Sequence, residues 1–375
     1  MMHKTRVTTI LGTRPELIRL SVIINKFDEV FDHRLVHTGQ NPDFKLSDVF
    51  FKELTIRDPD KYLKTSSETL GLFLGTLFSE IEIELQQFPP DAVVILGDTN
   101  SALSGLIAKR LGIPVYHLEA GNRSYDSNVP EETNRRIIDH FADFNLAYTN
   151  ISRENLIHEG LNPRFLTVIG SPLFEVISEF KSSIEESKIL SKLNIDSKKY
   201  FLVSAHRQEN VNDPRRLTTL IEALNSLAEN YSIPIIVSTH PRTKSRLKQL
   251  EISTNALIKF EDPFGFFDYN KLQKEARIVI SDSGSVAEES VILGFPAITI
   301  RDSLERPEAL ESGSLILSGI TSNGLLESIR ITESGTLAAN PPLEYSIKDT
   351  STRVVRYITS TVHQHALWSG LRKDK

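Results

Sequence analysis

Three acidic residues near the ends of short apolar runs are the strongest candidates for chemistry in this sequence. Asp98 and Glu119 each follow such a run closely, and Glu131 stands a little further along the chain. Carboxyl groups in different environments have different pKa values, so one can remove a proton while another returns it. The three acids therefore predict a site of proton transfer.

Each of these acids also has a structural interpretation. Asp98 is suited to cap the helix that is predicted to follow it. Glu131 and Glu132 can complement the positive end of a helix that has Pro130 in its first position. The sequence supports the catalytic and the capping role of Asp98 about equally, and the two are compatible. Neither structural role explains Glu119.

Residues at the ends of other apolar runs indicate a ligand with an anionic group. Arg14 lies in the segment GTRPE, where the predicted N-terminus of a helix and a guanidinium can hold an anion together. An arginine that only stabilises a loop is the simpler interpretation of this short segment. Gln40, in the segment HTGQN, is suited to bind hydroxyl groups, although a plain turn uses the same residue types.

The segment SDSGSVAEE gives the clearest prediction of a phosphate site. Ser283, Gly284 and Ser285 lie between an apolar run and a predicted helix, so their hydroxyls and amides are placed to bind a diphosphate. Glu289, about one helical turn further along, can accept hydrogen bonds from ribose hydroxyls. A capping box formed by Ser285 and Glu288 is the structural alternative, but it leaves the surrounding residues unexplained.

His206 and Arg207 follow another apolar run and add two candidates. The histidine can protonate or hydrogen-bond a phosphate oxygen, and the arginine can pair with another. A lone histidine at a strand end is more often structural, but the adjoining arginine favours a functional role. The segment STHPR, which contains His240 and Arg242, ends the next run in a similar way.

The elements that must position these residues follow from the spacing of the apolar runs. Each short run is followed by a turn and a helical pattern, which is typical of parallel strands joined by crossover helices, so the predicted fold class is α/β. Two successive series occur, with strands expected at Arg6–Leu11, Arg34–Thr38, Ala92–Leu96, Val115–Leu118, Leu146–Tyr148 and Leu166–Val168, and then at Tyr200–Ser204, Ile235–Ser238, Leu257–Phe260, Ile278–Ser281 and Ala297–Ile300.

Two Rossmann-like domains are expected, because 375 residues exceed what one core usually organises and no strand signal occurs between the two series. We place them at residues 1–173 and 174–350. A last helical segment within 351–375 can pack back on the first domain, which the sequence alone does not decide. Ligands bind such sheets beyond the carboxyl ends of the strands, where the candidate residues lie.

Composition and charge argue against several classes of protein. A hydrophobic fraction of 39% and a charged fraction of 25% are ordinary for a globular protein and argue against disorder. A net charge of -6 without a basic stripe argues against binding nucleic acid. The lack of cysteine removes disulfides, thiolate zinc sites and cysteine nucleophiles. The first residues hold no apolar run long enough for a signal peptide or membrane span, so we expect a soluble cytoplasmic protein.

Taken together, the motifs resemble those of the non-hydrolysing UDP-N-acetylglucosamine 2-epimerase family. The resemblance runs in order from Gly12 to about Gly313 and rests on GTRPE, HTGQN, GDTNS, HLEAGNR, VPEETNRR, SAHRQEN, SDSGSVAEE and ERPE, which are far more specific together than singly. It implies the glycosyltransferase-B architecture, with two Rossmann-like domains facing a central cleft where the chemistry occurs and UDP held mostly by the C-terminal domain. It also implies a UDP-sugar substrate, a homodimer, and neither a metal nor a redox cofactor.

The resemblance also implies a mechanism. A base removes the C2 proton as UDP leaves C1, which gives a 2-acetamidoglycal, and UDP returns after reprotonation on the other face. Acid–base work falls to Asp98, Glu119 and Glu131, without a choice among them, and stabilisation of the leaving UDP falls to His206. Contacts to substrate and nucleotide are implied for Arg14, Gln40, Arg135, Arg207, Tyr269, Ser283, Gly284, Ser285, Glu289 and Arg306. Two departures, Ser285 in place of a frequent glycine and Gln208 in place of a frequent charged residue, leave the proposed catalytic groups intact.

The identity of the sugar is predicted from three further segments, AGNRSYD, HTGQNPDF and DPFGFFDYNKLQ. They look like a subgroup associated with capsule and O-antigen sugars, which converts UDP-2-acetamido-2,6-dideoxy-L-talose to UDP-N-acetyl-L-fucosamine. We therefore expect this 6-deoxy substrate first, and conversion of UDP-N-acetylglucosamine to UDP-N-acetylmannosamine second. The aromatic residues of the third segment also fit a simpler role, which is to pack the second domain and stack on uracil.

Other functions share part of this pattern. A glycosyltransferase has the same architecture and UDP site, but it needs an acceptor surface and has no use for proton transfer at C2. A non-catalytic UDP-sugar sensor keeps the nucleotide residues and does not need the three acids, all of which are present. A hydrolysing epimerase releases free N-acetylmannosamine and UDP, which analysis of the products distinguishes.

Overall fold

The computed structural model describes residues 4–41, 44–66, 68–239, 243–244, 246–247, 250, 252–335 and 342–371. The chain forms two compact units, one of residues 1–178 and 346–375 and the other of residues 179–345. The expected domain boundary at residue 173 coincides with the start of helix α7 (Leu173–Glu179). His240 and Arg242 of the STHPR segment, and Pro42 and Asp43 of HTGQNPDF, lie outside the described residues.

The first unit is built on a parallel sheet of seven strands in the order β3-β2-β1-β4-β5-β6-β7. Its strands are β1 (Arg6–Leu11), β2 (Asp32–His37), β3 (Lys61–Tyr62), β4 (Ala92–Leu96), β5 (Val115–Leu118), β6 (Phe144–Ala147) and β7 (Leu166–Val168). The order reverses at β1, so the crevice beyond the carboxyl ends of β1 and β4 is the usual place for a ligand in such a sheet.

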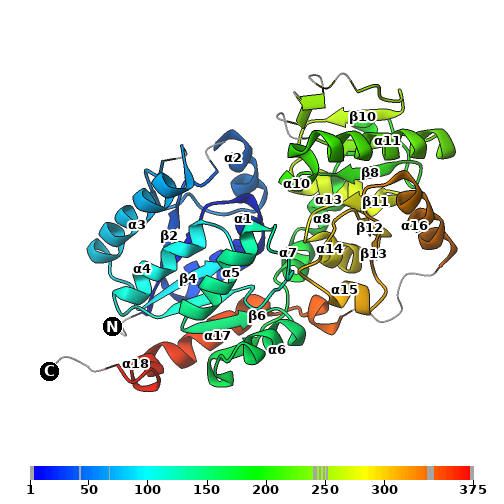
Figure 1. Cartoon of the computed structure of the whole chain (residues 1–375). Coiled ribbons are helices and arrows are strands. Elements are labelled where there is room, and N and C mark those ends of the chain that lie inside the picture. Colours follow the sequence, from blue (N-terminus) through cyan, green and yellow to red (C-terminus); the bar gives the residue numbers. More distant parts are fainter. Residues whose placement is uncertain are drawn as a thin grey trace. The chain divides into compact units, whose positions relative to one another are not determined.

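Crossover helices connect these strands and can be followed in Figure 1. The α-helices of the first unit before α7 are α1 (Arg14–Val30), α2 (Phe44–Glu53), α3 (Leu70–Gln87), α4 (Gly105–Arg110), α5 (Pro130–Phe141) and α6 (Asn150–His158), and short 3-10 turns occur at Ser101–Ser104 (η1) and Pro163–Phe165 (η2). Leu77, Ile81 and Leu85 of α3 recur at helical spacing and are buried against Val93 and Ile95 of β4. One apolar stripe of the helix therefore covers one face of the sheet.

The last helices of the chain belong to the first unit. Helix α17 (Thr350–Thr361) packs against α1, and the 3-10 turn η4 (Val362–Gln364) and α18 (His365–Trp368) follow it. The hydroxyl groups of Thr361 and Tyr116 in β5 lie 2.8 Å apart, in the interior of the unit. These contacts bring residues more than 240 positions apart in sequence together.

The second unit is built on a parallel sheet of six strands in the order β10-β9-β8-β11-β12-β13. Its strands are β8 (Phe201–Ser204), β9 (Ile235–Ser238), β10 (Ile258–Glu261), β11 (Ile278–Ser281), β12 (Ala297–Thr299) and β13 (Ile316–Leu317). Its helices are α8 (Lys181–Glu186), α9 (Ile189–Leu193), α10 (Gln208–Asn212), α11 (Pro214–Tyr231), α13 (Phe266–Glu275), α14 (Val286–Leu293), α15 (Glu308–Glu311) and α16 (Ser322–Ser334), and the 3-10 turn η3 (Leu343–Ser346) lies at the boundary of the two units.

Both faces of the second sheet are buried, which explains why its strands are continuous apolar runs. In β8, Phe201 and Val203 belong to the core cluster that includes α11 and α16, whereas Leu202 belongs to the cluster on the other face with α13 and α14. Alternate residues of a strand point to opposite faces, and here both faces are covered by helices.

The predicted α/β class and the two series of parallel strands are confirmed. Two short strands, β3 and β13, were not expected, because a strand of two residues gives no apolar run to detect. Strand β2 starts at Asp32, two residues before its expected start, and its polar first residues pair in register with Arg6 and Val7. In the described ranges, no helix has the length and apolar composition to cross a membrane.

Candidate active site

Glu16 occupies the N-terminus of helix α1, where the sequence predicted an anion site. Its carboxylate accepts hydrogen bonds from the amide of Gly12 at 3.0 Å and the hydroxyl of Thr13 at 2.7 Å, and from the hydroxyl of Thr99, beyond β4, at 3.0 Å. The chain therefore supplies its own carboxylate to the Gly12 amide, just before the helix, and binding of an anion at this helix N-terminus stays a prediction. Burial raises the pKa of Glu16 to about 7, although the hydrogen bonds from Thr13, Gly12 and Thr99 act to lower it.

Arg14, the other half of that prediction, lies partly buried in the first turn of α1. Its guanidinium carbon lies 5.7 Å from the centre of the Phe50 ring, which belongs to α2. A cation over an aromatic face is a favourable contact, and binding of an anion by Arg14 stays a prediction.

Gln40 fixes the loop after β2 to the loop after β4. Its side-chain oxygen accepts hydrogen bonds from the amide and the hydroxyl of Ser101, at 2.8 and 2.7 Å. Gly12 lies between these loops, and a Cβ there would stand only 2.0 Å from the Thr38 hydroxyl oxygen and 2.3 Å from that of Ser101. Glycine is therefore required for the close approach of the three loops.

Asp98, at the end of β4, forms an ion pair and does not cap a helix. Its carboxylate accepts hydrogen bonds from Arg135 of α5, at 2.6 Å from Nη2 and 3.1 Å from Nε. The 3-10 turn that follows has Asn100 in the cap position and no side-chain cap. The geometry thus decides against the capping role that the sequence left open, and Arg135 bridges two acids because it also donates to Glu132 at 3.1 Å.

Glu119, at the end of β5, has a backbone conformation that residues other than glycine rarely adopt. Its φ is +67°, and its carboxylate lies 3.5 Å from Arg19 Nε and 3.3 Å from the amide nitrogen of Asn122. Such strain persists only where the surrounding structure imposes it, and it often marks a functional residue. Arg19 is buried on the inner face of α1, with its guanidinium over the ring of Tyr148.

Glu131 and Glu132 have different surroundings, although they are neighbours in the first turn of α5. Pro130 is the first residue of that helix, as the sequence predicted. Glu132 is buried and accepts hydrogen bonds from Ser124 and Arg136 as well as from Arg135. Burial acts to raise the pKa of Glu132, but these hydrogen bonds and the charge of Arg135 outweigh it and hold the pKa below its ordinary value. Glu131 remains partly exposed at the end of the helix.

In the second unit, Asp282 shapes the loop that carries His206. The buried Asp282 carboxylate accepts hydrogen bonds from the amides of His206 and Arg207, at 2.9 Å each, and from the side-chain amide of Asn210 at 3.0 Å. These bonds fix the loop after β8 to the end of β11, and the His206 side chain is exposed there. An aspartate in a Ser-Asp-Ser-Gly segment looks like a turn residue, so its partners could not be predicted.

Arg207 and Arg306 are each held by an acidic residue of the second unit. Glu305 accepts from Arg207 at 3.1 Å and from Arg301 at 2.9 Å, both through its Oε1 atom. Arg306 pairs with Glu288 of α14 at 3.0 Å and donates to the carbonyl of Gly284 at 2.6 Å. The arrangement brings both arginines to the start of α14, where phosphate binding was predicted.

The serine residues at the start of α14 do not form the capping box. Ser285 is the N-cap residue without a side-chain cap, and its hydroxyl donates instead to Glu289 at 2.8 Å. The hydroxyl oxygens of Ser283 and Ser285 lie 2.9 Å apart, and Gln273 donates to the other carboxylate oxygen of Glu289 at 2.5 Å. Two hydroxyls and a carboxylate thus lie together at the carboxyl end of β11.

Tyr269 and the nearby aromatic residues differ in their roles. Burial, together with the charge of Glu289, raises the pKa of Tyr269, and a hydrogen bond with Ser204 acts in the opposite direction. Phe266 and Phe267 pack on Phe180 with ring centres 6.4 and 5.7 Å apart. The simpler interpretation, packing within the second unit, therefore holds for these two phenylalanines.

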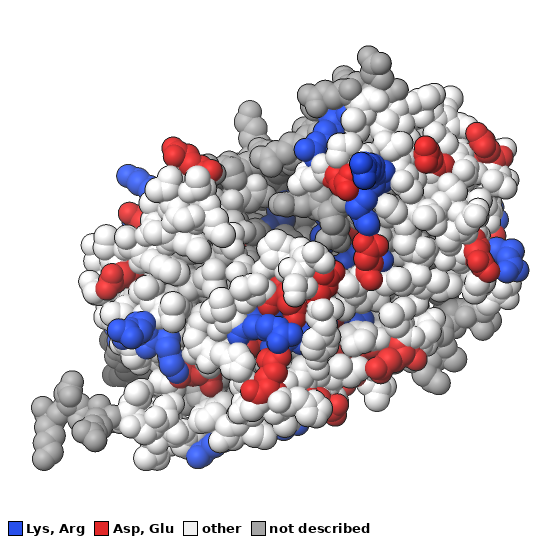
Figure 2. Space-filling model, viewed as in Figure 1, with Lys and Arg blue, Asp and Glu red and all other residues white. Residues whose placement is uncertain are grey.

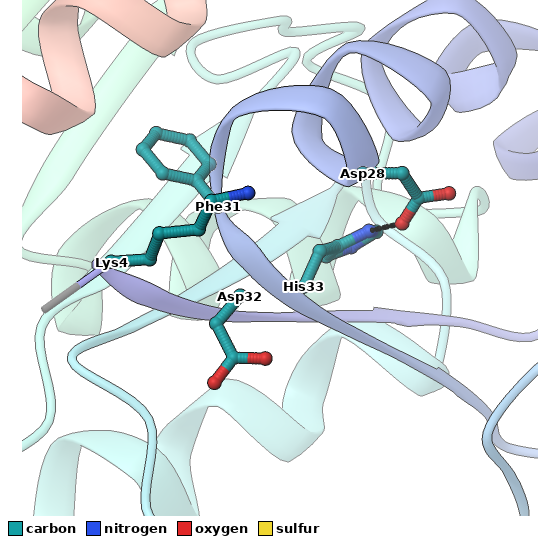
Figure 3. Close-up of a pocket in the computed structure, with 5 residues that line it drawn as sticks. All are labelled: Lys4, Asp28, Phe31, Asp32 and His33. Atoms are coloured by element: carbon teal, nitrogen blue, oxygen red, sulfur yellow. Dashed lines mark hydrogen bonds and ion pairs between the residues drawn. The ribbon is translucent and has the colours of Figure 1, made fainter. Parts of the chain in front are cut away.

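A cavity of about 350 Å³ lies in a different part of the first unit, lined by Lys4, Asp28, Phe31, Asp32 and His33 (Figure 3). His33 Nδ1 and Asp28 Oδ1 are 2.6 Å apart in it. Asp32 is the first residue of β2, so this cavity lies at the amino ends of the strands, away from the candidate acids. On the face shown in Figure 2, acidic and basic side chains alternate in small groups, without a continuous basic surface.

Several residues of the site were not predicted, because they carry charges at buried helical positions. Glu16 and Arg19 recur among the buried Leu17 and Leu20 of α1, and Asp139 lies on the buried face of α5. Charged residues are normally assigned to the exposed face of a helix. These residues could have been found in the sequence as charged residues at inward positions of an otherwise apolar helical pattern.

These features define a class of protein with two Rossmann-like units. The first unit has carboxylates at the carboxyl ends of its strands. The second has a serine–glycine loop and arginines at the carboxyl ends of its own strands. Comparison with known proteins narrows the class. The family model described as UDP-N-acetylglucosamine 2-epimerase matches residues 25–359.

Among relatives, the UDP-N-acetylglucosamine 2-epimerase of Methanocaldococcus jannaschii is 38% identical over 87% of this chain and 92% of its own length. The UDP-2,3-diacetamido-2,3-dideoxy-D-glucuronate 2-epimerase of Pseudomonas aeruginosa is 32% identical over 94% and 99%. The crystal structure of the M. jannaschii enzyme in complex with UDP-GlcNAc and UDP has a TM-score of 0.89 and 36% identity, and the match covers 95% of this chain and 100% of that one.

The chain therefore belongs to the UDP-N-acetylglucosamine 2-epimerase family. It is a nucleotide-sugar 2-epimerase, a carbohydrate isomerase of glycosyltransferase-B-like fold, as the resemblance of its motifs predicted.

Proposed function

We propose that this enzyme inverts C2 of a UDP-linked N-acetylhexosamine by elimination and re-addition. A carboxylate takes the proton from C2 while the C1–O bond breaks and its electrons leave with UDP, which gives a 2-acetamidoglycal. A second acid then protonates C2 on the opposite face as the UDP oxygen bonds again to C1. Every bond that breaks is formed again, so no oxidant, reductant or water is consumed.

The observation that carries this proposal is the arrangement of the acids in the first unit. Asp98 and Glu119 follow the adjacent strands β4 and β5, and Glu131 stands at the start of the helix whose Arg135 holds Asp98. Asp98 is paired at 2.6 Å with an arginine, whereas Glu119 has a longer contact of 3.5 Å with Arg19. Acids with unequal partners can serve as base and acid in the same cycle.

Residues of the second unit supply the contacts to UDP in this proposal. Ser283, Ser285 and Arg306 bind the diphosphate, and Glu289 accepts from the ribose. His206 and Arg207 stabilise the charge that develops on UDP as it leaves. UDP leaves C1 in the first step and bonds to C1 again in the second, so these contacts must hold it between the two steps.

For the sugar, we propose UDP-2-acetamido-2,6-dideoxy-L-talose, with UDP-N-acetyl-L-fucosamine as the product and capsule or O-antigen synthesis as its use. The AGNRSYD segment supports this choice. It places Tyr125, which is 71% exposed with φ +53°, in the loop between Glu119 and Glu131. An exposed aromatic ring suits a methyl group at C6 better than a hydroxymethyl group.

The second candidate substrate is UDP-N-acetylglucosamine, with UDP-N-acetylmannosamine as its product. The names of the relatives favour it, since the M. jannaschii protein is named for this activity. The P. aeruginosa relative, named for a diacetamido glucuronate, supports the view that the sugar varies within the family.

A side-by-side NMR assay with equal concentrations of the two UDP-sugars tests the choice. We expect a kcat/KM for the 6-deoxy sugar about tenfold or more above that for UDP-N-acetylglucosamine, because a misplaced polar or methyl group typically changes discrimination by at least this factor. The reverse preference would replace the first substrate by the second. Release of free N-acetylmannosamine would contradict the re-addition step.

We also propose that the enzyme is a cytoplasmic homodimer. Leu72 and Ile83 of α3 are about half exposed and lie on the same side of the helix. A second copy of the chain covering this apolar surface would remove it from water. Sedimentation equilibrium separates the 42.2 kDa chain from its dimer, and a monomer mass at micromolar concentration would contradict the proposal.

A further inference from the structure

A buried histidine–aspartate pair links the loops that carry the candidate acids. His117, the third residue of β5, lies with Nδ1 3.0 Å from Asp139 Oδ1 and with Nε2 2.8 Å from the carbonyl oxygen of Gly97. The side chains of both residues are almost completely buried. Gly97 immediately precedes Asp98, so one ring nitrogen of His117 reaches the backbone that carries this acid.

The same aspartate also reaches the loop that carries the second acid. The Gly121 amide donates to both Asp139 carboxylate oxygens, at 3.2 and 3.3 Å, and Gly121 comes two residues after Glu119. Asp139 itself lies one helical turn after Arg135, the residue that holds Asp98. The pair therefore touches the end of β4, the loop after β5 and helix α5 at once.

The surroundings of the His117 ring determine the role of its Nε2 atom. A carbonyl oxygen can only accept, so Nε2 donates to Gly97. Nδ1 faces Asp139 and, at 3.3 Å, the side-chain oxygen of Asn145, whose amide nitrogen donates to the Asp139 carbonyl. Arg123 also contacts the Asp139 carboxyl group, at 2.7 Å.

The charged groups of this network are paired with one another. Arg123 pairs with Asp139 at 2.7 Å and with Glu159 at 2.6 Å, and Glu159 also lies 3.5 Å from Arg136. A buried charge is tolerated when it is paired and hydrogen-bonded, and removal of one member leaves the others uncompensated. The position of each group is therefore strongly coupled to the others.

We propose that His117 and Asp139 are positioning residues for the epimerisation, and that His117 holds the Gly97 carbonyl through Nε2 and thereby orients Asp98. Neither residue touches the substrate. This inference rests on the acid–base role proposed for Asp98 and Glu119. Loss of the pair should shift the strand-end loops and so reduce the rate of proton transfer, with little effect on the binding of UDP by the second unit.

The protonation state can be tested without any activity measurement. In protein labelled with ¹⁵N-histidine, long-range ¹H–¹⁵N correlation spectra distinguish a doubly protonated ring from either neutral form, and the spectrum of His117→Gln assigns the signal. We expect a proton on Nε2 of His117, because the hydrogen bond to the Gly97 carbonyl requires it. A ring protonated on Nδ1 alone would overturn the proposal.

The test of the positioning role needs a control variant that removes a similarly buried aspartate–histidine pair. Asp143 supplies it, because this buried aspartate of the same unit pairs with His365 at 2.7 Å and accepts from Lys109 at 2.5 Å. It binds the amide of Val115, the first residue of β5, and so lies at the opposite end of that strand. Asp139→Asn and Asp143→Asn should both lower the melting temperature.

Kinetics then separate the two variants. Asp139→Asn should lower kcat on the order of 10- to 100-fold, the cost of a misplaced catalytic group, with KM and the Kd for UDP nearly unchanged, and Asp143→Asn should keep the kcat of the unmodified enzyme. If Asp139→Asn does not fold, His117→Gln, which keeps one donor, should show the same selective loss of kcat. An equal kcat in both aspartate variants would contradict the positioning role, whereas a lack of any epimerisation by the unmodified enzyme would instead contradict the proposed function.

Discussion

At the scale of single residues, the partners of each carboxyl group distinguish the acids of the first unit from one another. Glu132 accepts hydrogen bonds from two arginines and a serine and is fully engaged in holding α5 to its neighbours. Asp98 shares one arginine with it, and Glu119 is held in a strained conformation beside another. A group that must exchange protons cannot be locked by many donors, which favours Asp98, Glu119 and Glu131 over Glu132.

Substitution of the three acids tests this assignment. Asp98→Asn, Glu119→Gln and Glu131→Gln should each lower kcat by on the order of 100-fold or more, because each removes a general acid or base, while the Kd for UDP changes little. Asp91→Asn is a suitable control, since Asp91 pairs with Arg6 at the other end of β4. Steady-state kinetics with calorimetric titration of UDP provide the measurement, and near-normal turnover in all three variants would end the assignment.

Glu16 should make the stability of the first unit depend on pH. Its pKa rises from 4.5 unfolded to about 7 folded, so the folded state binds the proton more tightly. The resulting stabilisation is complete below about pH 4.5, is lost as pH rises through 7, and amounts to about 3 kcal/mol. Buried His37 has the opposite effect, because burial lowers its pKa to about 4, so its stabilisation is lost as pH falls.

Glu16→Gln isolates this contribution, because the amide keeps the acceptor for Gly12 but cannot ionise. The difference in unfolding free energy between the variant and the unmodified chain should shift in favour of the variant by a few kcal/mol from pH 5 to pH 8. Denaturant melts of both proteins across this range provide the measurement. A difference independent of pH would show that Glu16 does not titrate as proposed.

The sequence predicted individual site residues only in part. Asp98, Glu119 and His206 could be found because each interrupts an apolar pattern at a strand end. Residues that hold these groups could not be predicted in the same way. Arg19 contacts Glu119, His117 contacts the carbonyl before Asp98, and Asp282 binds the amide of His206. These contacts join distant elements, which spacing along the chain does not encode. Spacing likewise did not indicate that Glu16 turns back onto the Gly12 amide at the expected anion site.

At the scale of elements, helix α5 does more than connect two strands. Asn134 donates to the carbonyl of Asp98 and to Asn100, Arg135 holds the Asp98 carboxylate, and Asp139 binds the loop after β5. Three residues on one helix therefore fix the ends of two adjacent strands. This explains why a helix with such a charged inner face folds stably, since its charges are paired and not solvated.

Helix α14 of the second unit allows a matched test of nucleotide binding. A Cβ at Gly284, before the helix, would stand 2.8 Å from Glu305 Oε2. It would displace Glu305, which accepts hydrogen bonds from Arg207 and Arg301. Gly284→Ala should therefore weaken UDP binding about tenfold. Gly294 ends the same helix with φ +71°, and Gly294→Ala should reduce stability by about 1 kcal/mol without affecting UDP.

Calorimetric titration of UDP and thermal melts of both variants provide the measurement. Equal UDP affinity in Gly284→Ala and the unmodified chain would remove the start of α14 from the proposed nucleotide site.

Most elements could be predicted because buried parallel strands are continuous apolar runs. The exceptions have physical causes: β3 and β13 are too short to form a run, and the polar start of β2 is held by its register with β1. In the aromatic segment, Phe266 and Phe267 pack on Phe180 inside the second unit, so no substrate is needed to explain these two rings.

At the scale of the whole molecule, length and two series of strands predicted two Rossmann-like units, and both sheets have the expected parallel order. The return of α17 to the first unit was left open, because its contacts with α1 and Tyr116 cross almost the whole chain. The two units carry different candidate residues: the candidate acids occur in the first unit and the candidate phosphate-binding residues in the second.

Turnover in heavy water tests the central claim, proton transfer at C2, most directly. The enzyme is incubated with the UDP-sugar in D₂O, and the recovered substrate and product are examined by ¹H NMR and mass spectrometry. We expect one deuterium at C2 of the product and a loss of the C2–H signal in returned substrate, with deuterated product formed on the order of 100-fold or more slowly by Asp98→Asn, Glu119→Gln and Glu131→Gln. Product formed with its C2 hydrogen retained would contradict the account.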